Sequence, residues 1–446
     1  MRTFSFICLV LLATTKALAT QTLLVDAYQN AIKYGIEFAI AKSKHDTVQE
    51  ETRQAKTLIY PKISLLANYD YEDGDQSFGS SLGEPSRSSN LQLTLKQPIY
   101  NRAYWYRIDA AKENELSSAS AFKSYQQEIA YVVSEAYFLQ ALNRNSLDAL
   151  MVEKKSYKIQ LEKIQKQYEK GLSDKLSLLN AELELNKSNS KILKARGELR
   201  RSSLDFKRLV GKDLIPKSSD ILVSKYPSII STLFKFEHPL QDKEFWTSKA
   251  LDNAEVVQFA SKIKAAKHNK EVQKSDHYPS LSLDIESSRN KQHNIIQNVS
   301  DDVKASLIFS MPLYRGGSTS SKVRAAQLQI QQAEQEYKSN LEMVKLEISA
   351  VIDNLTHNQS YMGSLRVGVQ SAEELLDATN KMHKSGLQSL VDVRMAEAKL
   401  SLAKNSFLEA LYVALLQRME LFKLTGGLGV RDLASADQLL NNTGLE

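Results

Sequence analysis

The chain has 446 residues, of which 42% are hydrophobic and 25% are charged, which is typical of a folded protein rather than a disordered one. A length of this size accommodates about three average domains. The formal net charge is only +6, and no patch dense in Lys and Arg is interleaved with aromatic residues. We therefore exclude a nucleic-acid-binding protein.

The N-terminal segment has the pattern of a secretory signal peptide, which we predict to cover residues 1–19. Arg2 supplies the positive start, and the apolar run from Phe4 to Ala13 is broken only by Ser5. The small residues Ala17 and Ala19 then form a cleavage motif. The run is too short to span a bilayer as a mature helix. The alternative interpretation of this segment is a buried first helix.

The only cysteine, Cys8, lies within this segment, so the mature chain would contain none, which suits an oxidising compartment. After residue 20 no apolar run reaches the eighteen residues of a transmembrane helix. If the protein crosses a membrane, we expect it to do so with β-strands.

The chain contains two copies of one plan, separated by a stretch rich in proline. Four motif pairs recur at offsets of 218, 214, 215 and 215 residues: Tyr60-Pro61 with Tyr278-Pro279, Gln97-Pro98-Ile99-Tyr100 with Met311-Pro312-Leu313-Tyr314, Gly171-Leu172 with Gly386-Leu387, and Val210-Gly211 with Thr425-Gly426. Such regularity predicts a tandem duplication. We assign residues 20–211 to the first repeat, 212–245 to a linker, 246–427 to the second repeat and 428–446 to a tail.

Each copy is predicted to contain one β-hairpin that follows a helix. In the first copy a helix is expected from about Leu23 to Leu58, ending before Pro61. Alternating apolar residues then predict strands within about 62–98, joined by a polar loop over 73–89. In the second copy the hairpin is expected at about 280–312, with a polar loop that continues through Asp301.

Long helical tracts follow each hairpin, at about 101–210 and 318–425. No glycine or proline occurs from Ala103 to Tyr168, and an unbroken helix of that length would reach on the order of 100 Å. Gly363 and Gly368 are expected to interrupt the second tract. Two series step by three and four residues as heptad seams do: Val344, Ile348, Val351, Leu355, and Ala396, Leu400, Ala403, Phe407, Ala410, Ala414.

Four strands per chain are too few to close a barrel, because about eight is the smallest number that does so. Lone strands in lipid would also expose unpaired edges. Several copies of the chain must therefore pool their strands. Three copies would give twelve strands, although two or four would also close a ring.

The segment from Met311 to Gly317, placed between a strand and a long helix, resembles the signature of the TolC family of outer membrane efflux proteins. Its weaker partner from Gln97 to Tyr100, the two Tyr-Pro pairs and the Gly-Leu turns are also similar, in order, over about 22–427. The strand-to-helix motif of the resemblance comprises Pro98, Tyr100, Pro312, Tyr314, Gly316 and Gly317.

The resemblance implies a mixed α and β membrane protein: a homotrimer with a 12-stranded β-barrel in the outer membrane, continuous with a periplasmic α-helical barrel. Residues 212–245 and the tail would form a belt around the helices. The expected function is a passive export channel in contact with outer-membrane lipid. Its implied partners are a periplasmic adaptor and an inner-membrane pump or ABC exporter, in drug efflux or type I secretion.

Two sets of site residues follow from the resemblance. The first set matches the helix turns that contact the adaptor, which are Gly171, Leu172, Ser173, Gly386 and Leu387. A plain helix turn without a partner is the alternative. Glycine permits the turn, and an exposed leucine offers a small apolar contact.

The second set would line a pore constriction at the periplasmic mouth: Asp392, Ser177, His383, Gln388 and Met395. Three copies of Asp392 would form a ring of carboxylates that favours cations. The alternative is a solvated helical aspartate. This chain carries Met395 where the family has a second aspartate, Gln388 for an arginine, His383 for a tyrosine and Ser177 for another acidic residue. We therefore expect one acidic ring rather than two.

Nothing in the sequence indicates an enzyme, a cofactor or a metal site. The seven histidines show no close pairing of the kind that zinc sites use. Two other functions fit part of the pattern. A periplasmic adaptor would need β-rich domains flanking a single coiled coil. A soluble coiled-coil scaffold would need neither a signal peptide nor alternating strands.

Overall fold

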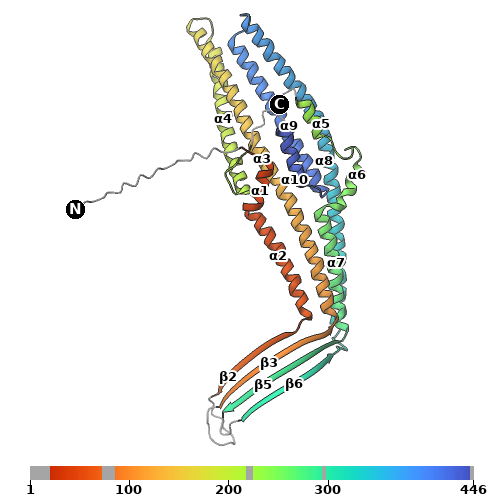
Figure 1. Cartoon of the computed structure of the whole chain (residues 1–446). Helices are drawn as coiled ribbons and strands as arrows, with labels where there is room; N and C mark the ends of the chain where they lie inside the picture. The colour runs from red at the N-terminus through yellow and green to blue at the C-terminus, as the bar shows by residue number, and fades with distance from the viewer. Residues whose placement is uncertain (1–20, 73–85, 217–224, 294–297, 442–446) are drawn as a thin grey trace, which may run out of the picture.

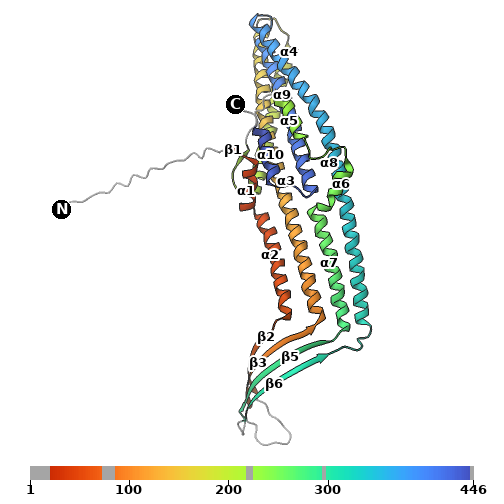
Figure 2. The ribbon, with the colours of Figure 1, turned by 45° about the vertical axis from the view of Figure 1, so that its right-hand side comes forward.

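The computed structural model describes residues 21–72, 86–216, 225–293 and 298–441; the predicted signal peptide, with Cys8, lies outside the described residues. The molecule is elongated, with a bundle of long helices at one end and a curved β-sheet at the other (Figures 1 and 2). No described helix has both the length and the apolar character needed to cross a membrane.

The main sheet has four antiparallel strands in the order β2-β3-β5-β6. Two hairpins build it: β2 (Lys62–Glu72) with β3 (Ser86–Asn101), and β5 (Ser280–His293) with β6 (Asn298–Ser310). The hairpins join through β3 and β5, so β2 and β6 are left as the two edges. Within the described residues, four strands per chain are present in this sheet, as the alternation of apolar residues predicts.

The two faces of this sheet differ in chemistry because side chains alternate along each strand. Residues in register place one set on a common side, which we call the apolar face: Ile63, Leu65, Ala67, Tyr69, Tyr71, Leu91, Leu93, Leu95, Leu281, Leu283, Ile285, Val303, Ala305, Leu307 and Phe309. The opposite, polar face carries Asn68, Asp70, Gln92, Thr94, Lys96, Asp284, Glu286, Asp302 and Lys304, with Leu66 and Ile308 as apolar exceptions. The apolar face is open to its surroundings: Leu65 is 67% exposed and Val303 is 80% exposed.

A long helix follows each hairpin, directly after β3 and after residues 311–317 in the case of β6. After β3, α3 (Arg102–Glu169) begins with the side chain of Asn101 accepting from Ala103 N at 3.0 Å, and it runs for 68 residues. After β6, α8 (Ser318–Lys384) runs for 67 residues. Shorter helices return from their far ends, α4 (Lys175–Val210) and α9 (Leu390–Leu424). At that end the order is α4, α3, α9, α8 (Figure 1).

The first helices of each copy run from the middle of the molecule toward the sheet (Figure 1). They are α1 (Leu24–Tyr34), α2 (Ile36–Lys56) and the short η1 (Thr57–Ile59) in the first copy. In the second copy they are η3 (Lys249–Asp252), α7 (Ala254–Lys274) and η4 (Ser275–His277). Here α2 packs on α3, α3 on α7, and α7 on α8, so the helices continue the lateral order of the strands.

A middle zone is built from the linker and the tail. It contains β1 (Gln21–Thr22) paired in parallel with β4 (Ile215–Pro216), together with α5 (Tyr226–Leu233), α6 (Lys243–Ser248) and α10 (Val430–Asn441). Asp437 of α10 accepts from the backbone N–H groups of Leu24 at 2.9 Å and Val25 at 3.0 Å. A carboxylate at a helix N-terminus satisfies free donors and complements the helix dipole. The tail thereby fixes the start of α1.

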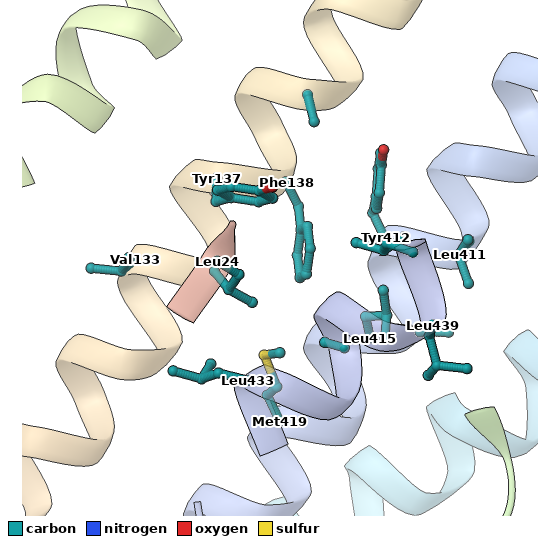
Figure 3. Close-up of a cluster of buried hydrophobic side chains, with 14 of the residues drawn as sticks. Leu24, Val133, Tyr137, Phe138, Leu411, Tyr412, Leu415, Met419, Leu433 and Leu439 are labelled. Carbon is teal, nitrogen blue, oxygen red and sulfur yellow. The ribbon is translucent and has the colours of Figure 1, made fainter. Parts of the chain in front are cut away.

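The larger hydrophobic core lies in this middle zone, where α1, α3, α9 and α10 meet (Figure 3). Phe138 of α3 stacks on Tyr412 of α9 with ring centroids 5.3 Å apart, and Tyr226 of α5 stacks on Phe407. A second cluster joins α6, α8 and the end of α9. It contains all four residues of the predicted seam Val344, Ile348, Val351 and Leu355.

Three element predictions need correction. The first helix is not continuous, because Gly35 adopts an extended conformation that separates α1 from α2. Strand β3 passes through Pro98 to Asn101, with a register shift between Pro98 and Tyr100, because proline has no N–H to donate to the ladder. Gly363 and Gly368 do not interrupt α8, since a glycine weakens a helix without breaking a well-packed one.

The polar loops are also shorter than predicted. Strand β5 extends to His293, β6 begins at Asn298, and β3 begins at Ser86, so polar segments expected as loops belong to strands. Arg289 of β5 and Asp301 of β6 face each other in register and form two hydrogen bonds of 2.6 and 2.7 Å. Cross-strand pairing of opposite charges therefore stabilises strands that the hydrophobic pattern does not reveal. Residues 73–85 of the first predicted loop lie outside the described residues.

Candidate functional site

The two turns that end the long helices have nearly the same geometry. Gly171 and Gly386 have φ angles of +71° and +78°, in the left-handed region that glycine reaches without strain. The following residues, Leu172 and Leu387, are each 74% exposed. Ser173 completes the first turn and directly precedes the residue that caps α4. The turns from α3 to α4 and from α8 to α9 lie at the far end from the sheet (Figure 1), and each carries one exposed leucine.

The return helices begin with two versions of the same cap. In α4 the side chain of Asp174 accepts from Ser177 N at 2.7 Å. In α9 the residues are exchanged: Ser389 is the cap, and Asp392 occupies the position that corresponds to Ser177. Asp392 Oδ2 accepts from Ser389 N at 2.9 Å and from Ser389 Oγ at 2.6 Å, which forms a capping box. The acidic group has therefore moved by three positions between the copies.

These hydrogen bonds hold the pKa of Asp392 below its ordinary value. The Ser389 hydroxyl is the largest cause, followed by the Ser389 N–H, and the charge of Lys163 adds to the effect while burial opposes it. The pKa of Asp174 is lowered in the same way, by the Ser177 side chain and N–H. Hydrogen bonds donated to a carboxylate favour its charged form. Both acidic groups are therefore ionised at neutral pH.

Lys163 links the two helical hairpins close to these caps. It lies near the end of α3, and its Nζ donates to Ser389 Oγ at 3.3 Å. Both residues of this contact line a groove of about 410 Å³ between α3 and the start of α9. We call it the tip groove; it is lined by Ile159, Glu162, Lys163, Lys166, Gln167, Lys170, Leu172, Ser389, Leu390 and Val391.

The other predicted pore residues lie around the same caps. His383 Nδ1 is 2.8 Å from the backbone oxygen of Gln388, a contact that braces the turn between α8 and α9. Gln388 and Met395 are half-buried, and Ser177 lies in the first turn of α4. Ser177 belongs to the start of α4, and the other four residues belong to the end of α8, the start of α9 and the turn between them. These helix ends lie at the end of the molecule opposite the sheet (Figure 1).

The two strand-to-helix motifs differ from each other. Pro98 and Tyr100 belong to β3, at its irregular register, whereas Pro312 and Tyr314 follow the end of β6. Gly316 and Gly317 both have positive φ and turn the chain into α8. Arg315 and Lys322 approach Asp276 at 3.3 and 3.7 Å, which joins this turn to the short helix η4.

Sequence reasoning missed Lys163, Asp174 and Ser389. The pattern Ser389-Leu390-Val391-Asp392 is a readable capping box before an apolar run, and it could have identified the local partner of Asp392. Lys163 gives no local signal, because its contact joins residues 226 positions apart.

The fold is that of outer-membrane channel proteins. It is similar to the crystal structure of the Campylobacter jejuni CmeC outer membrane channel, with a TM-score of 0.73 and 14% identity, covering 95% of this chain and 90% of that one. Among curated proteins, the chain is 23% identical to the outer membrane protein TolC of Vibrio cholerae, covering 92% of each. It is 22% identical to the alkaline protease secretion protein AprF of Pseudomonas aeruginosa, covering 87% of this chain and 81% of that protein.

The family itself is identified by a profile for outer membrane efflux proteins, which matches residues 27–212 and 246–427. The chain belongs to the outer membrane efflux protein family, and it is a protein of the outer membrane. The resemblance drawn from the Pro-Tyr and Gly-Leu motifs is confirmed. Members of this family are channel proteins, so membership argues against an enzyme.

Proposed function

We propose that this chain is one of three identical subunits of a passive export duct. Three copies would pool their strands into a 12-stranded outer-membrane barrel and their long helices into a periplasmic α-helical barrel. A periplasmic adaptor would couple the duct to an inner-membrane pump or ABC exporter that supplies the energy.

The observation that carries this proposal is the four-stranded sheet. Its edges, β2 and β6, have no partner within the described sheet, and its apolar face is exposed over all four strands. Exposed edges are not tolerated in lipid, so neighbouring copies must cover them. Pairing β6 of one copy with β2 of the next would leave the apolar face toward lipid and the polar face toward the lumen.

The remaining segments have a place in such a duct. Residues 1–19 would be removed as a signal peptide. Residues 212–245 and the tail 428–446 would form the belt in the middle zone, and the tie from Asp437 to the start of α1 supports that role. The two repeats, 20–211 and 246–427, would alternate around the ring.

The class of cargo follows from the family only in part. AprF is named for alkaline protease secretion, whereas CmeC is described only as an outer membrane channel. We propose drug efflux, type I protein secretion or both, with the inner-membrane partner selecting the cargo. An adaptor or a coiled-coil scaffold without channel activity is disfavoured, because the family profile covers both repeats of the chain.

The tip would be the periplasmic mouth of this duct. The exposed turns at Gly171-Leu172-Ser173 and Gly386-Leu387 would contact the adaptor. Asp392 would contribute one ring of three carboxylates to the constriction, with Ser177, His383, Gln388 and Met395 near it. Both described hydrogen bonds of Asp392 end on Oδ2, so capping is compatible with a role for Oδ1 in the pore.

The experiment that tests the proposal starts from the full chain, extracted from the outer membrane and kept unboiled. A heat-labile trimer on a denaturing gel and ion conductance in planar bilayers are the expected results. A water-soluble monomer without conductance would refute the duct. Deleting the gene and measuring both drug susceptibility and secreted proteins would then identify the cargo.

A further inference from the structure

The N-terminus of α8 has no side-chain cap. Gly317 stands at the cap position and has no side chain that could accept a hydrogen bond. Within the described residues, the N–H groups of Thr319 and Ser320 have no acceptor. In the first copy α3 is capped, because the side chain of Asn101 accepts from Ala103 N at 3.0 Å. The start of α8 thus keeps free donors at the positive end of the helix dipole.

A small cavity of about 100 Å³ lies against this helix end. It is lined by Asp276 and His277 of η4, by residues 312–315, and by Gly317, Thr319 and Ser320. We call it the junction cavity, because it lies where the chain passes from β6 to α8 (Figure 1). A cavity of this volume holds one small group rather than a helix or a whole lipid.

The side chain of Thr319 is buried at the junction cavity without a hydrogen-bond partner. It is 6% exposed, and it lines the cavity. In the part of the chain that the structure describes, its hydroxyl forms no hydrogen bond, yet this oxygen is not among the polar atoms that are closed off from solvent. The hydroxyl therefore opens onto the cavity that the side chain lines. A ligand that accepts from it would supply the hydrogen bond that a buried hydroxyl requires.

The charge beside the junction cavity is positive. Arg315 Nη1 lies 3.3 Å and Lys322 Nζ lies 3.7 Å from the same oxygen of Asp276. One carboxylate cannot neutralise two cations, so one positive charge remains next to the free N–H groups. Backbone donors at a helix N-terminus, a hydroxyl and a guanidinium are together the groups that bind phosphate in proteins.

Two neighbouring side chains indicate where such a phosphate comes from. Leu313 is 90% exposed and Tyr314 is 87% exposed. In the proposed duct, these residues lie where the strands end and the long helices begin, which is the boundary between the outer membrane and the periplasm (Figure 1). Tyrosine is enriched at the headgroup level of membranes, where its ring is apolar and its hydroxyl is polar. The phosphate available at this level is that of a phospholipid.

We propose that the junction cavity binds the phosphate group of a phospholipid headgroup from the inner leaflet of the outer membrane. The phosphate oxygens accept from the N–H groups of Thr319 and Ser320 and from the Thr319 hydroxyl, and Arg315 and Lys322 balance the charge. The lipid origin of the phosphate rests on the proposed function, whereas the binding of phosphate does not. Three such contacts fix the height of the duct in the membrane.

The probe is dihexanoyl phosphatidylglycerol, a short-chain lipid used below its critical micelle concentration. Binding to the full channel in a non-ionic detergent is measured by microscale thermophoresis. Dihexanoylglycerol, which lacks the phosphate, and inorganic phosphate are the comparison probes. The lipid should bind roughly tenfold more tightly than either one, because it combines the charged hydrogen bonds with apolar contacts.

The variant Thr319→Val keeps the shape of the side chain but removes its hydroxyl, and it should weaken lipid binding roughly threefold to tenfold. Its control is Ser321→Ala, which removes a hydroxyl from the same helical turn outside the cavity lining. Arg315→Gln should weaken binding to a similar degree. Its control is Arg324→Gln, which removes the same charge from an exposed position of α8 outside the lining. Both controls should bind like the unmodified channel.

Equal affinity for phosphatidylglycerol and dihexanoylglycerol, no binding of any probe, or the same affinity in the variants and their controls would overturn the site. Inorganic phosphate that binds as tightly as the lipid would overturn the lipid as its source. Planar-bilayer conductance of the same preparations separates these outcomes from failure of the proposed function. A trimer that conducts but shows no preference for the phosphorylated lipid would refute only the headgroup site.

Discussion

Asp392 combines a structural role that the structure defines with an electrostatic role that the family resemblance suggests. Its Oδ2 atom holds the N-terminus of α9 through Ser389, and its negative charge lies at the positive end of the helix dipole. Replacing Asp392 by a neutral residue of the same shape removes the charge but retains part of the cap. Replacing the Ser389 side chain weakens the cap but leaves the charge of Asp392 in place. The two roles can therefore be separated by two different substitutions.

We predict that Asp392→Asn lowers the cation preference of the channel, measured as a shift of the reversal potential toward zero in a KCl gradient. Ser389→Ala should leave the reversal potential nearly unchanged but weaken the cap by about 1 kcal/mol, seen as faster amide exchange at residues 390–393. An Asp392→Asn channel with unaltered selectivity would remove this carboxylate from the pore.

The depressed pKa of Asp392 also predicts how the tip responds to acid. Because the folded-state pKa lies below the unfolded value of about 3.9, the stabilisation is fully present above that pH. It is lost as the pH falls from about 3.9 through the folded pKa. Amide exchange in the first turn of α9, corrected for intrinsic rates, should rise in this interval. The Asp392→Asn variant should lack this component, and identical pH profiles for both proteins would contradict the assignment.

At the scale of elements, the contact between Lys163 and Ser389 joins hairpins that otherwise meet along the packed faces of α3 and α9. In the proposed duct, widening of the mouth would move these hairpins apart, so a contact across the tip would favour the closed form. Lys163 is exposed, and its contribution is therefore that of a surface interaction, of about 0.2–1 kcal/mol.

We predict that Lys163→Met shifts the channel toward opening, by up to about fivefold in the ratio of open to closed states. Single-channel recordings should show a higher open probability or mean conductance. Lys158→Met, five residues away on α3 and outside the groove, serves as the control. If both variants conduct like the unmodified channel, the contact has no part in closing the mouth.

Most of the elements could be predicted from the sequence because each has a regular pattern. The heptad series from Val344 to Leu355 gives a buried seam, and the alternation in β2 gives its apolar face. The extension of β5 to His293 could not be predicted, because the last residues of this strand show no apolar alternation. Their strand conformation depends on pairing with β6. The link from Lys163 to Ser389 was equally inaccessible, since no local pattern reports a contact between distant hairpins.

At the scale of the whole molecule, the duplication places two hairpins side by side so that each chain supplies a third of a proposed cylinder. In that cylinder the apolar face would be the surface that meets lipid. Successive side chains of a strand point to opposite faces of the sheet. Leu65 and Leu66 are neighbours in β2 that lie on opposite faces. They are 67% and 51% exposed in the single chain. This pair offers a test in which size and hydrophobicity are matched.

We predict that Leu65→Arg prevents stable insertion of the trimer, while Leu66→Arg is tolerated. A cation that faces lipid near the middle of the membrane costs about 2–4 kcal/mol, and three copies would repeat this cost in each trimer. In contrast, Leu66 pairs with Gln92 on the polar face, where an arginine would meet water and carboxylates such as Glu286, which already accepts from Gln92 at 2.7 Å. The measurement is the amount of heat-labile trimer in outer-membrane fractions, with total protein level as the control. Equal loss for both variants would show that the two faces are not separated by lipid and lumen, and it would remove the basis for the three-fold duct.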